Sequence, residues 1–180
     1  MQRAAWMTLV VVVSSLFVRA EVAHADVREY TGELELFGGV LFTDDALLDG
    51  EGAVYGLRVG YNASDRWGFQ AALGLHEDDG FSGKTPFDYE AWNLDLSAVY
   101  HVNPEDTAVF TVFGGVGASF IDVDPSAFED DTFTAHFGLA GKFAVSEHAY
   151  LRLDARARWL EDSDHVDLET TFALGFRWGN

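Results

Sequence analysis

The sequence predicts a single all-β domain in which eight antiparallel strands close into an up-and-down barrel. Apolar and polar residues alternate with a period of two after residue 28, which is the period of a strand and not of a helix. The alternation falls into eight runs of roughly ten to fourteen residues, whereas an ordinary soluble strand has about five or six. Connections between the runs are alternately short and long. Together these observations favour a barrel of long strands.

The first four runs cover residues 29–42, 52–61, 67–76 and 90–102, and each has one apolar face that is rich in aromatic residues. The opposite face carries glycine and polar residues, so the two sides of each strand face different surroundings. The apolar positions, in chain order, are Tyr30, Leu34, Leu36, Val40, Phe42, Ala53, Tyr55, Leu57, Val59, Tyr61, Trp67, Phe69, Ala71, Leu73, Leu75, Trp92, Leu94, Leu96, Ala98 and Tyr100.

The last four runs, residues 108–120, 132–145, 149–160 and 166–178, repeat this pattern, with Phe113 as a bulky exception on the polar face. Their length matches the nine to eleven or so residues that a tilted strand needs to cross a bilayer. The apolar positions are Phe110, Val112, Val116, Ala118, Phe120, Phe133, Ala135, Phe137, Leu139, Phe143, Leu151, Leu153, Ala155, Ala157, Trp159, Val166, Leu168, Phe172, Leu174, Phe176 and Trp178.

The first 25 residues are predicted to be a cleaved secretory signal peptide. Arg3 supplies a positive start, a short apolar core follows, and Ala23-His24-Ala25 is a small-residue cleavage site. A retained membrane anchor is the alternative, but the apolar run is shorter than the ~20 residues that a spanning helix needs. We therefore expect a signal peptide at 1–25 and a barrel domain at 26–180.

The apolar face is expected to point outward, toward lipid. A soluble carrier of the lipocalin kind would turn this face inward. However, nine glycines lie on the polar face, where a narrow barrel interior needs small residues and a solvated surface gains nothing from them. They are Gly39, Gly56, Gly60, Gly68, Gly74, Gly115, Gly117, Gly138 and Gly175.

Aromatic residues gather at both ends of the runs, as the two interfaces of a membrane select. The girdle on the side of the short turns is predicted to contain Tyr30, Tyr61, Trp67, Tyr100, Phe143 and Trp178. The girdle on the side of the long loops is predicted to contain Phe42, Trp92, Phe120, Phe133 and Trp159.

The connections also follow a membrane pattern, because short periplasmic turns and longer outer loops are typical of outer-membrane barrels. The fourth outer loop, 161–165, is short. The periplasmic turns are 62–66, 103–107 and 146–148, and the long outer loops are 43–51, 77–89 and 122–131.

The leader, the eight alternating runs and the terminal strand from Thr171 to Trp178 resemble the small outer-membrane barrels of the OmpA/OmpX type. The resemblance implies an outer-membrane location and a last strand that is read by the barrel-assembly machinery during insertion. In that family the last strand ends in an aromatic residue, whereas Trp178 is followed here by Gly179-Asn180. The peptidoglycan-binding domain of OmpA-like proteins is not expected.

The polar face carries nearly balanced charges, which predicts an ion-pair network that fills the lumen. Buried charges must be paired, because an unpaired one costs several kcal/mol. A narrow ion or solute conduit is the alternative. The acids are Glu33, Glu35, Asp95, Asp154, Asp167 and Glu169, and the bases are Arg58, Lys142, Arg152, Arg156, Arg158 and Arg177.

A specific pairing can be predicted for Arg58. The first two strands are antiparallel neighbours, and counting from Tyr61 and Tyr30 places Arg58 opposite Glu33. Strand tilt and shear shift such a count by a few residues, so Glu35 is the other candidate partner.

The formal charge of −19, from 30 acids against 11 bases, argues against binding nucleic acid. The excess of acids falls in the predicted outer loops, where carboxylates suit hard divalent cations. We expect contacts with outer-membrane lipid and lipopolysaccharide, and cation bridging to the anionic lipopolysaccharide is one hypothesis. Solubility and repulsion of neighbours is the simpler explanation.

No catalytic or cofactor site is predicted, and the chain has no cysteine. Neither the G-x-S-x-G motif of serine hydrolases nor the zinc-binding H-E-x-x-H motif occurs, and no serine lies within two residues of His136. The expected function is that of a monomeric integral outer-membrane protein with a structural or surface-interaction role. A lipid A-modifying enzyme is the alternative, since a catalytic triad can assemble from distant residues.

Overall fold

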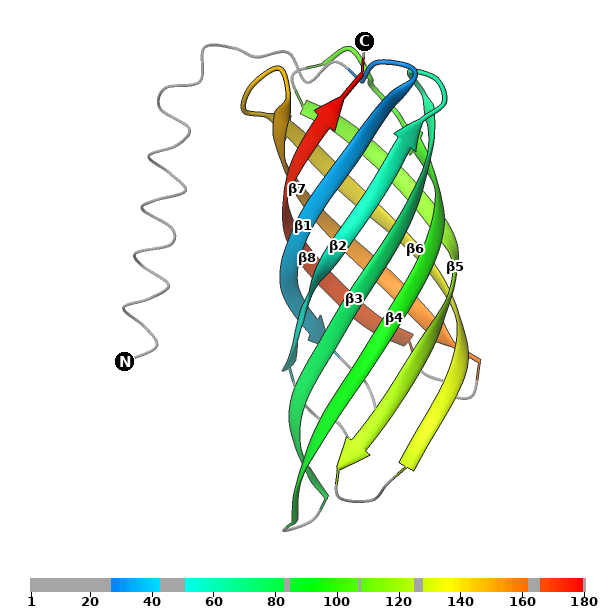
Figure 1. Cartoon of the computed structure of the whole chain (residues 1–180), viewed down its shortest axis with the longest axis vertical. Coiled ribbons are helices and arrows are strands. Elements are labelled where there is room, and N and C mark those ends of the chain that lie inside the picture. Colours follow the sequence, from blue (N-terminus) through cyan, green and yellow to red (C-terminus); the bar gives the residue numbers. More distant parts are fainter. Residues whose placement is uncertain are drawn as a thin grey trace, which may run out of the picture.

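The structure is a computed structural model that describes residues 27–42, 51–82, 85–106, 108–124, 128–161 and 166–179. Eight strands in these segments form a closed barrel in which sequential strands are antiparallel neighbours and β8 returns to pair with β1 (Figure 1). The strands are β1 (Thr31–Phe42), β2 (Glu51–Asn62), β3 (Trp67–Ser82), β4 (Thr85–His101), β5 (Ala108–Asp124), β6 (Phe128–Ala144), β7 (Ala149–Leu160) and β8 (Val166–Trp178).

The predicted fold class, an eight-stranded up-and-down β-barrel, is confirmed. The predicted signal peptide, residues 1–25, lies outside the described residues. Within the described segments we find no helix of the length and apolarity that crossing a membrane requires. We call the two ends of the barrel the turn end, which has the short connections and the C-terminus, and the loop end.

The register of the strands fixes the tilt and the width of the barrel. A path of paired residues that leaves β1 at Thr31 returns to β1 at Leu41, ten residues further along. A stagger of this size tilts the strands by about 40° and gives a backbone diameter of about 16 Å. The path runs through Asn62, Gly68, Val99, Phe113, Gly138, Arg156 and Glu169.

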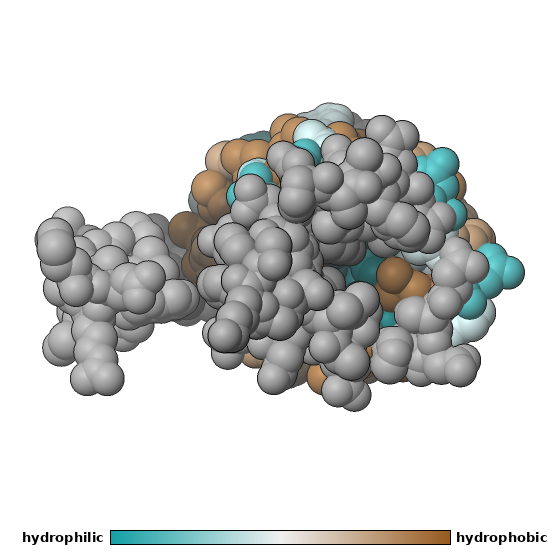
Figure 2. Space-filling model, turned by 90° about the horizontal axis from the view of Figure 1, so that it is seen from below, coloured by the Kyte–Doolittle hydropathy of each residue, from teal (hydrophilic) through white to brown (hydrophobic). Residues whose placement is uncertain are grey.

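Side chains alternate between an apolar outer wall and a polar lumen. On β4, Leu96 is 60% exposed whereas its neighbour Asp95 is 2% exposed. Viewed from the loop end, brown hydrophobic residues cover much of the visible outer wall (Figure 2). Such an inverted barrel buries its apolar surface in lipid and not in its own core.

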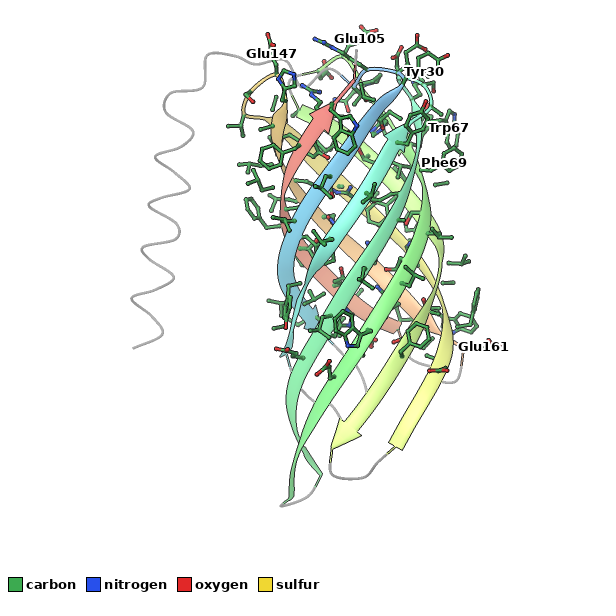
Figure 3. The ribbon with its side chains drawn as sticks, in the orientation of Figure 1. Tyr30, Trp67, Phe69, Glu105, Glu147 and Glu161 are labelled. Carbon is green, nitrogen blue, oxygen red and sulfur yellow. The ribbon has the colours of Figure 1, made fainter. Side chains whose placement is uncertain are left out.

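The predicted girdle residues lie on the outer wall in two groups, one at the turn end and one on the loop side of the apolar band. Tyr30 and Trp67 lie at the turn end, whereas Glu161 marks the loop end (Figure 3). The rings of Trp67 and Tyr100 meet edge to face with centroids 4.9 Å apart. On β6, Phe133 and Phe143 are ten residues apart, which at this tilt is about 25 Å along the barrel axis and matches the apolar band of outer-membrane barrels.

Two predicted outer loops are wrong, because most of their residues are strand. β3 and β4 continue through segment 77–89, and their pairing reaches Ser82 opposite Thr85. Likewise β5 and β6 continue into segment 122–131, with Asp122 opposite Glu129. These acidic segments lack the alternation of a membrane strand, yet beyond the bilayer a hairpin needs only cross-strand hydrogen bonds. Residues 43–50 and 162–165 lie outside the described residues.

As a result, β3, β4, β5 and β6 are 16 or 17 residues long, whereas the other four strands have 12 or 13. The barrel wall is therefore taller on one side. Figure 1 shows β3–β6 projecting beyond the remaining strands at the loop end. We call this projection the extended wall.

The first testable prediction concerns the lipid face. Leu96→Arg places a charge on the outer wall of β4, midway between the girdle residues Tyr100 and Trp92. We expect a loss of about 2–4 kcal/mol in folding free energy, because arginine is costly near the bilayer midplane. Urea titrations of folding into lipid vesicles measure the loss. Leu96→Phe is the matched control and should change stability little; equal losses would contradict the assigned facing.

The second prediction concerns close backbone approach inside the barrel. A Cβ atom at Gly115 would overlap the carbonyl oxygen of Leu96 and lie 2.8 Å from the Cα atom of Ser97, neither of which can move freely. At Gly38 the nearest atom would be the Val54 carbonyl oxygen at 3.8 Å. Gly115→Ala should therefore cost about 1–3 kcal/mol in the same assay, whereas Gly38→Ala should be nearly neutral. Similar effects at both positions would contradict this explanation.

Candidate functional site

Among the residues whose side chains the structure describes, the lumen contains ten charged side chains that are each at most 6% exposed, five acids and five bases. All of them occupy inward positions of the alternating strands, so the pattern that builds the barrel also collects these charges. The set carries no net formal charge. Its members are Glu33, Glu35, Asp95, Asp154 and Glu169, with Arg58, Lys142, Arg152, Arg156 and Arg158.

The group nearest the turn end is built around two glutamates of β1. Lys142 of β6 donates from Nζ to Glu33 at 2.5 Å. Arg152 of β7 contacts Glu35 at 3.2 Å, and the hydroxyl of Tyr150 donates to the same carboxylate at 2.8 Å. Both glutamates therefore bind partners from strands that are not paired with β1.

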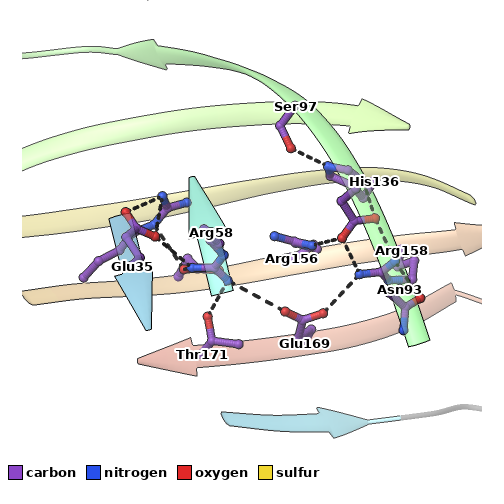
Figure 4. Close-up of polar contacts among 12 residues, drawn as sticks. Glu35, Arg58, Asn93, Ser97, His136, Arg156, Arg158, Glu169 and Thr171 are labelled. Atoms are coloured by element: carbon purple, nitrogen blue, oxygen red, sulfur yellow. Dashed lines mark hydrogen bonds and ion pairs between the residues drawn. The ribbon is translucent and has the colours of Figure 1, made fainter. Parts of the chain in front are cut away.

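Arg58 of β2 lies at the centre of the network and is fully buried. Its guanidinium donates to both carboxylate oxygens of Asp154, at 2.8 and 3.2 Å, and to Thr171 Oγ1 at 2.9 Å. Glu35 is 3.4 Å away and Glu169 is 4.0 Å away. Figure 4 shows Arg58 between these groups. Two paired hydrogen bonds to one carboxylate make Asp154 its main partner.

The pairing predicted for Arg58 is therefore only partly right. Glu35 is its direct cross-strand neighbour, whereas Glu33 lies opposite Gly60. The count from the aromatic residues fails because Tyr30 and Tyr61 are not opposite each other: Tyr61 pairs with Gly32, two residues further along the chain. Asp154 was not a candidate partner, because sequence neighbours do not reveal contacts across the lumen.

The group nearest the loop end is built around Asp95 of β4. Arg156 donates to this carboxylate at 2.6 Å, and Arg158 donates at 3.0 and 2.9 Å. Arg158 also reaches Glu169 of β8 at 3.4 Å, which connects this group to the one around Arg58 (Figure 4). Eight of the charges thus form one chain of contacts along the barrel, from Arg152 and Glu35 to Asp95 and Arg156, and Lys142 pairs with Glu33 beside it.

Two members of the predicted network, Asp167 and Arg177, are not among these ten buried charges. Asp167 is half-buried at the start of β8, near the loop end. Arg177 is at the opposite end of the same strand, at the turn end, and its Nε donates to the backbone carbonyl of Glu147 at 2.7 Å. The side chain therefore contacts the turn between β6 and β7.

Aromatic side chains also occupy the lumen: the sequence placed Phe113 on the polar face as an exception, but Phe37 was not predicted there. Phe37 packs under the Arg58 guanidinium at 4.1 Å, and Phe113 lies 5.2 and 5.4 Å from Arg152 and Arg156. Cations over aromatic faces gain about 0.5–2 kcal/mol when water is excluded. The alternation of side chains along the strand could have revealed Phe37, because it is on the same side of β1 as Glu33 and Glu35.

The structure also brings together a hydroxyl, an imidazole and a carboxylate. Ser97 Oγ lies 2.8 Å from His136 Nε2, and His136 Nδ1 lies 3.6 Å from Asp95. This order matches a catalytic triad, but Ser97 is 6% exposed and faces the lumen, away from any lipid substrate. Asp95 is already bound by two arginines. The described residues contain no metal-binding cluster of histidine and acidic side chains.

A small cavity lies in the part of the lumen near the turn end. Its volume is about 10 Å³, which is room for about one water molecule. Its lining includes Glu33, Asn62, Gln70, Lys142 and Arg152. Space of this size inside a charged network fits a filled lumen.

The third prediction tests coupling across the lumen. Arg58→Met and Asp154→Asn should each cost about 3–5 kcal/mol, because each leaves a buried charge without its main partner. The double variant should lose less than the sum of the two. Urea unfolding in lipid vesicles gives the three values of this double-mutant cycle.

The control cycle combines Arg58→Met with Glu33→Gln, because Glu33 binds Lys142 and not Arg58. Its coupling should be clearly smaller. Equal coupling in both cycles would show that the specific contact between Arg58 and Asp154 contributes nothing beyond general electrostatics.

Comparisons with known proteins agree with this geometry. A family model described as the outer membrane protein β-barrel domain matches residues 8–179. The N-terminal barrel of Pseudomonas aeruginosa OprF is 16% identical, with a TM-score of 0.63, and the match covers 83% of this chain and 98% of that one. No curated protein sequence matches the chain.

Two further solved structures have similar folds. Neisserial surface protein A is 12% identical with a TM-score of 0.63, covering 83% of this chain and 100% of that one. Ail of Yersinia pestis, solved with the heparin analogue sucrose octasulfate, is 12% identical with a TM-score of 0.60, covering 83% and 99%. The family model matches nearly the whole chain, and the structure is a closed barrel with an apolar outer wall and a polar lumen. The chain therefore belongs to the outer-membrane β-barrel proteins and is located in the outer membrane.

Proposed function

We propose that the protein is a non-enzymatic component of the outer-membrane surface, whose extended wall contacts lipopolysaccharide through divalent cations. The observation that carries this proposal is the row of acidic residues across β3–β6. Glu77 is paired with Glu90, Glu90 with Asp122, and Asp122 with Glu129. In outer-membrane barrels the short turns are periplasmic, so this row lies on the outer side of the bilayer.

Glu77 and Glu90 show how the row meets the aromatic girdle. Both are exposed, and each accepts a hydrogen bond from a girdle-side aromatic residue: Tyr55 donates to Glu77 at 2.6 Å and Trp92 Nε1 donates to Glu90 at 2.9 Å. Like charges directly opposite each other destabilise a sheet by roughly 0.2–1 kcal/mol. A divalent cation between such carboxylates would remove this repulsion.

The chemistry of the neighbouring lipid supports the same partner. Lipopolysaccharide is anionic, and Lys84 is the single base among residues 77–90 and 122–131. Two anionic surfaces attract only through counter-ions, and carboxylate and phosphate oxygens are the ligands that Ca²⁺ and Mg²⁺ prefer. The protein would then be held in its lipid surroundings without a basic patch.

The two alternative functions have less support. A conduit would need open space, but the lumen is occupied by paired charges and packed aromatic rings. A lipid A-modifying enzyme would need a nucleophile that reaches lipid, whereas Ser97 faces inward. We further infer that the protein acts as a monomer, that the barrel-assembly machinery inserts it through β8, and that its acidic surface binds no nucleic acid.

The fourth prediction tests cation bridging. In vesicles that contain lipopolysaccharide, Mg²⁺ should raise the melting temperature of the barrel by about 2–4 °C, corresponding to ~1 kcal/mol. The double variant Glu77→Gln with Glu90→Gln should lose most of this increase, because its carboxylates no longer bind the cation. The loss of the compact band on unheated gels measures melting.

The control variant is Glu105→Gln with Glu147→Gln, which removes the same number of exposed acids at the turn end. It should keep the full response to Mg²⁺. Vesicles without lipopolysaccharide should show little increase for any variant. Equal responses of both double variants in lipopolysaccharide would refute the proposal.

A further inference from the structure

Residues 27–30 turn inward at the turn end, immediately before β1. Tyr30 has a φ of +59°, a left-handed conformation that a bulky residue adopts only where surrounding contacts enforce it. Its backbone N–H donates to the Asn62 carbonyl at 2.7 Å, and the Glu29 N–H donates to Asp65 Oδ1 at 3.2 Å. These bonds hold the turn against β2 and the connection that follows it.

Val27 is buried on the other side of the barrel mouth. It is 4% exposed and packs with Val109 of β5 and Ala144 of β6. Its N–H donates to the Pro104 carbonyl at 2.9 Å, in the connection between β4 and β5. In a closed barrel with sequential strand order, β5 stands opposite β1. Residues 27–30, which we call the strap, therefore cross the mouth.

The dimensions agree with a crossing. The backbone diameter is about 16 Å, and four extended residues span at most about 13–14 Å. The valine side chain and the inward side chains of β5 fill the remaining distance. The strap is held in the middle as well, because the Thr31 hydroxyl donates to the Arg28 carbonyl at 2.6 Å.

A layer of polar residues on the lumen side of the strap is shielded from solvent. Thr31, Asn62 and His101 stand at the very ends of their strands, yet none is more than 3% exposed. His101 lies 3.1 Å from Asn62 Oδ1 and 3.2 Å from Thr111 Oγ1, and Asn62 Nδ2 donates to Thr31 at 3.0 Å. An open mouth would leave such terminal residues wet, so they need a cover.

We propose that the strap is a seal that closes the periplasmic mouth of the lumen. A single apolar residue, Val27, holds it against Val109, and the strap covers the polar layer of Thr31, Asn62 and His101. With the seal in place, periplasmic water and ions do not exchange with this end of the network. Displacing Val27 opens the mouth and leaves the strands of the barrel intact.

Cysteine labelling tests the seal, because the chain contains no cysteine of its own. Thr111→Cys is the reporter, since Thr111 is 1% exposed in the polar layer on the lumen side of the strap. Labelling with a cationic methanethiosulfonate should be at least tenfold faster when Val27→Asp is added. The exposed strap variant Glu29→Gln should leave the rate unchanged.

Thr134→Cys is the matched reporter in the lumen near the loop end, and its labelling should be slow with or without Val27→Asp. Gel mobility without heating checks that each variant remains folded. Equal labelling of residue 111 in both backgrounds would overturn the proposal. Equal acceleration at residue 134 would also overturn it, because it would mean that Val27 supports general stability and not a local seal.

A second measurement does not depend on a destabilising variant. Val27→Cys with Val109→Cys should form a disulfide on mild oxidation, because the two side chains pack together. Val27→Cys with Val99→Cys should not, because Val99 packs with Phe113 and Ala140 deeper in the lumen. A folded 27–109 variant that fails to cross-link, or that cross-links no better than the 27–99 variant, would overturn the crossing strap.

Discussion

Arg58 lies in the middle of the lumen with no exposed surface, and its guanidinium is held by Asp154, Thr171 and Glu35. In a barrel about 16 Å wide that is surrounded by lipid, such a group has no access to bulk water. It must be neutralised by partners that the strands bring to it. The other buried charges follow the same requirement, and five acids meet five bases.

The narrow interior explains the other features of the lumen. Long guanidinium side chains need space, so glycine lies where neighbouring strands approach most closely, as at Gly115 beside Leu96. Flat rings such as Phe37 and Phe113 fill the gaps between cations and gain cation–π energy. The stagger of ten residues aligns partners from different strands at the same height. Charge, packing and register therefore depend on one another.

Much of this fold could be predicted from alternation alone, because lipid selects one face of every strand so strongly that Leu96 and Asp95 cannot exchange places. Alternation does not extend beyond the bilayer, so the acidic hairpins of the extended wall were predicted as loops. The sequence does not reveal contacts across the lumen either. The alternation of side chains places Asp154 and Arg58 in the same interior, but it does not show that they are in contact. The bond between Ser97 and His136 escaped for the same reason.

The distribution of the lumen charges along the chain has a consequence for how the barrel forms. Of the ten buried charges described above, β1–β4 contribute three acids and one base, whereas β5–β8 contribute two acids and four bases. The first half of the chain thus has a negative inner face, and the second half has a positive one. Each half alone would present uncompensated charge to the bilayer, so a half-inserted sheet is unfavourable. The opposite charges attract the two halves to each other. Pairing of β1 with β8 is therefore the step that neutralises the charge on both inner faces.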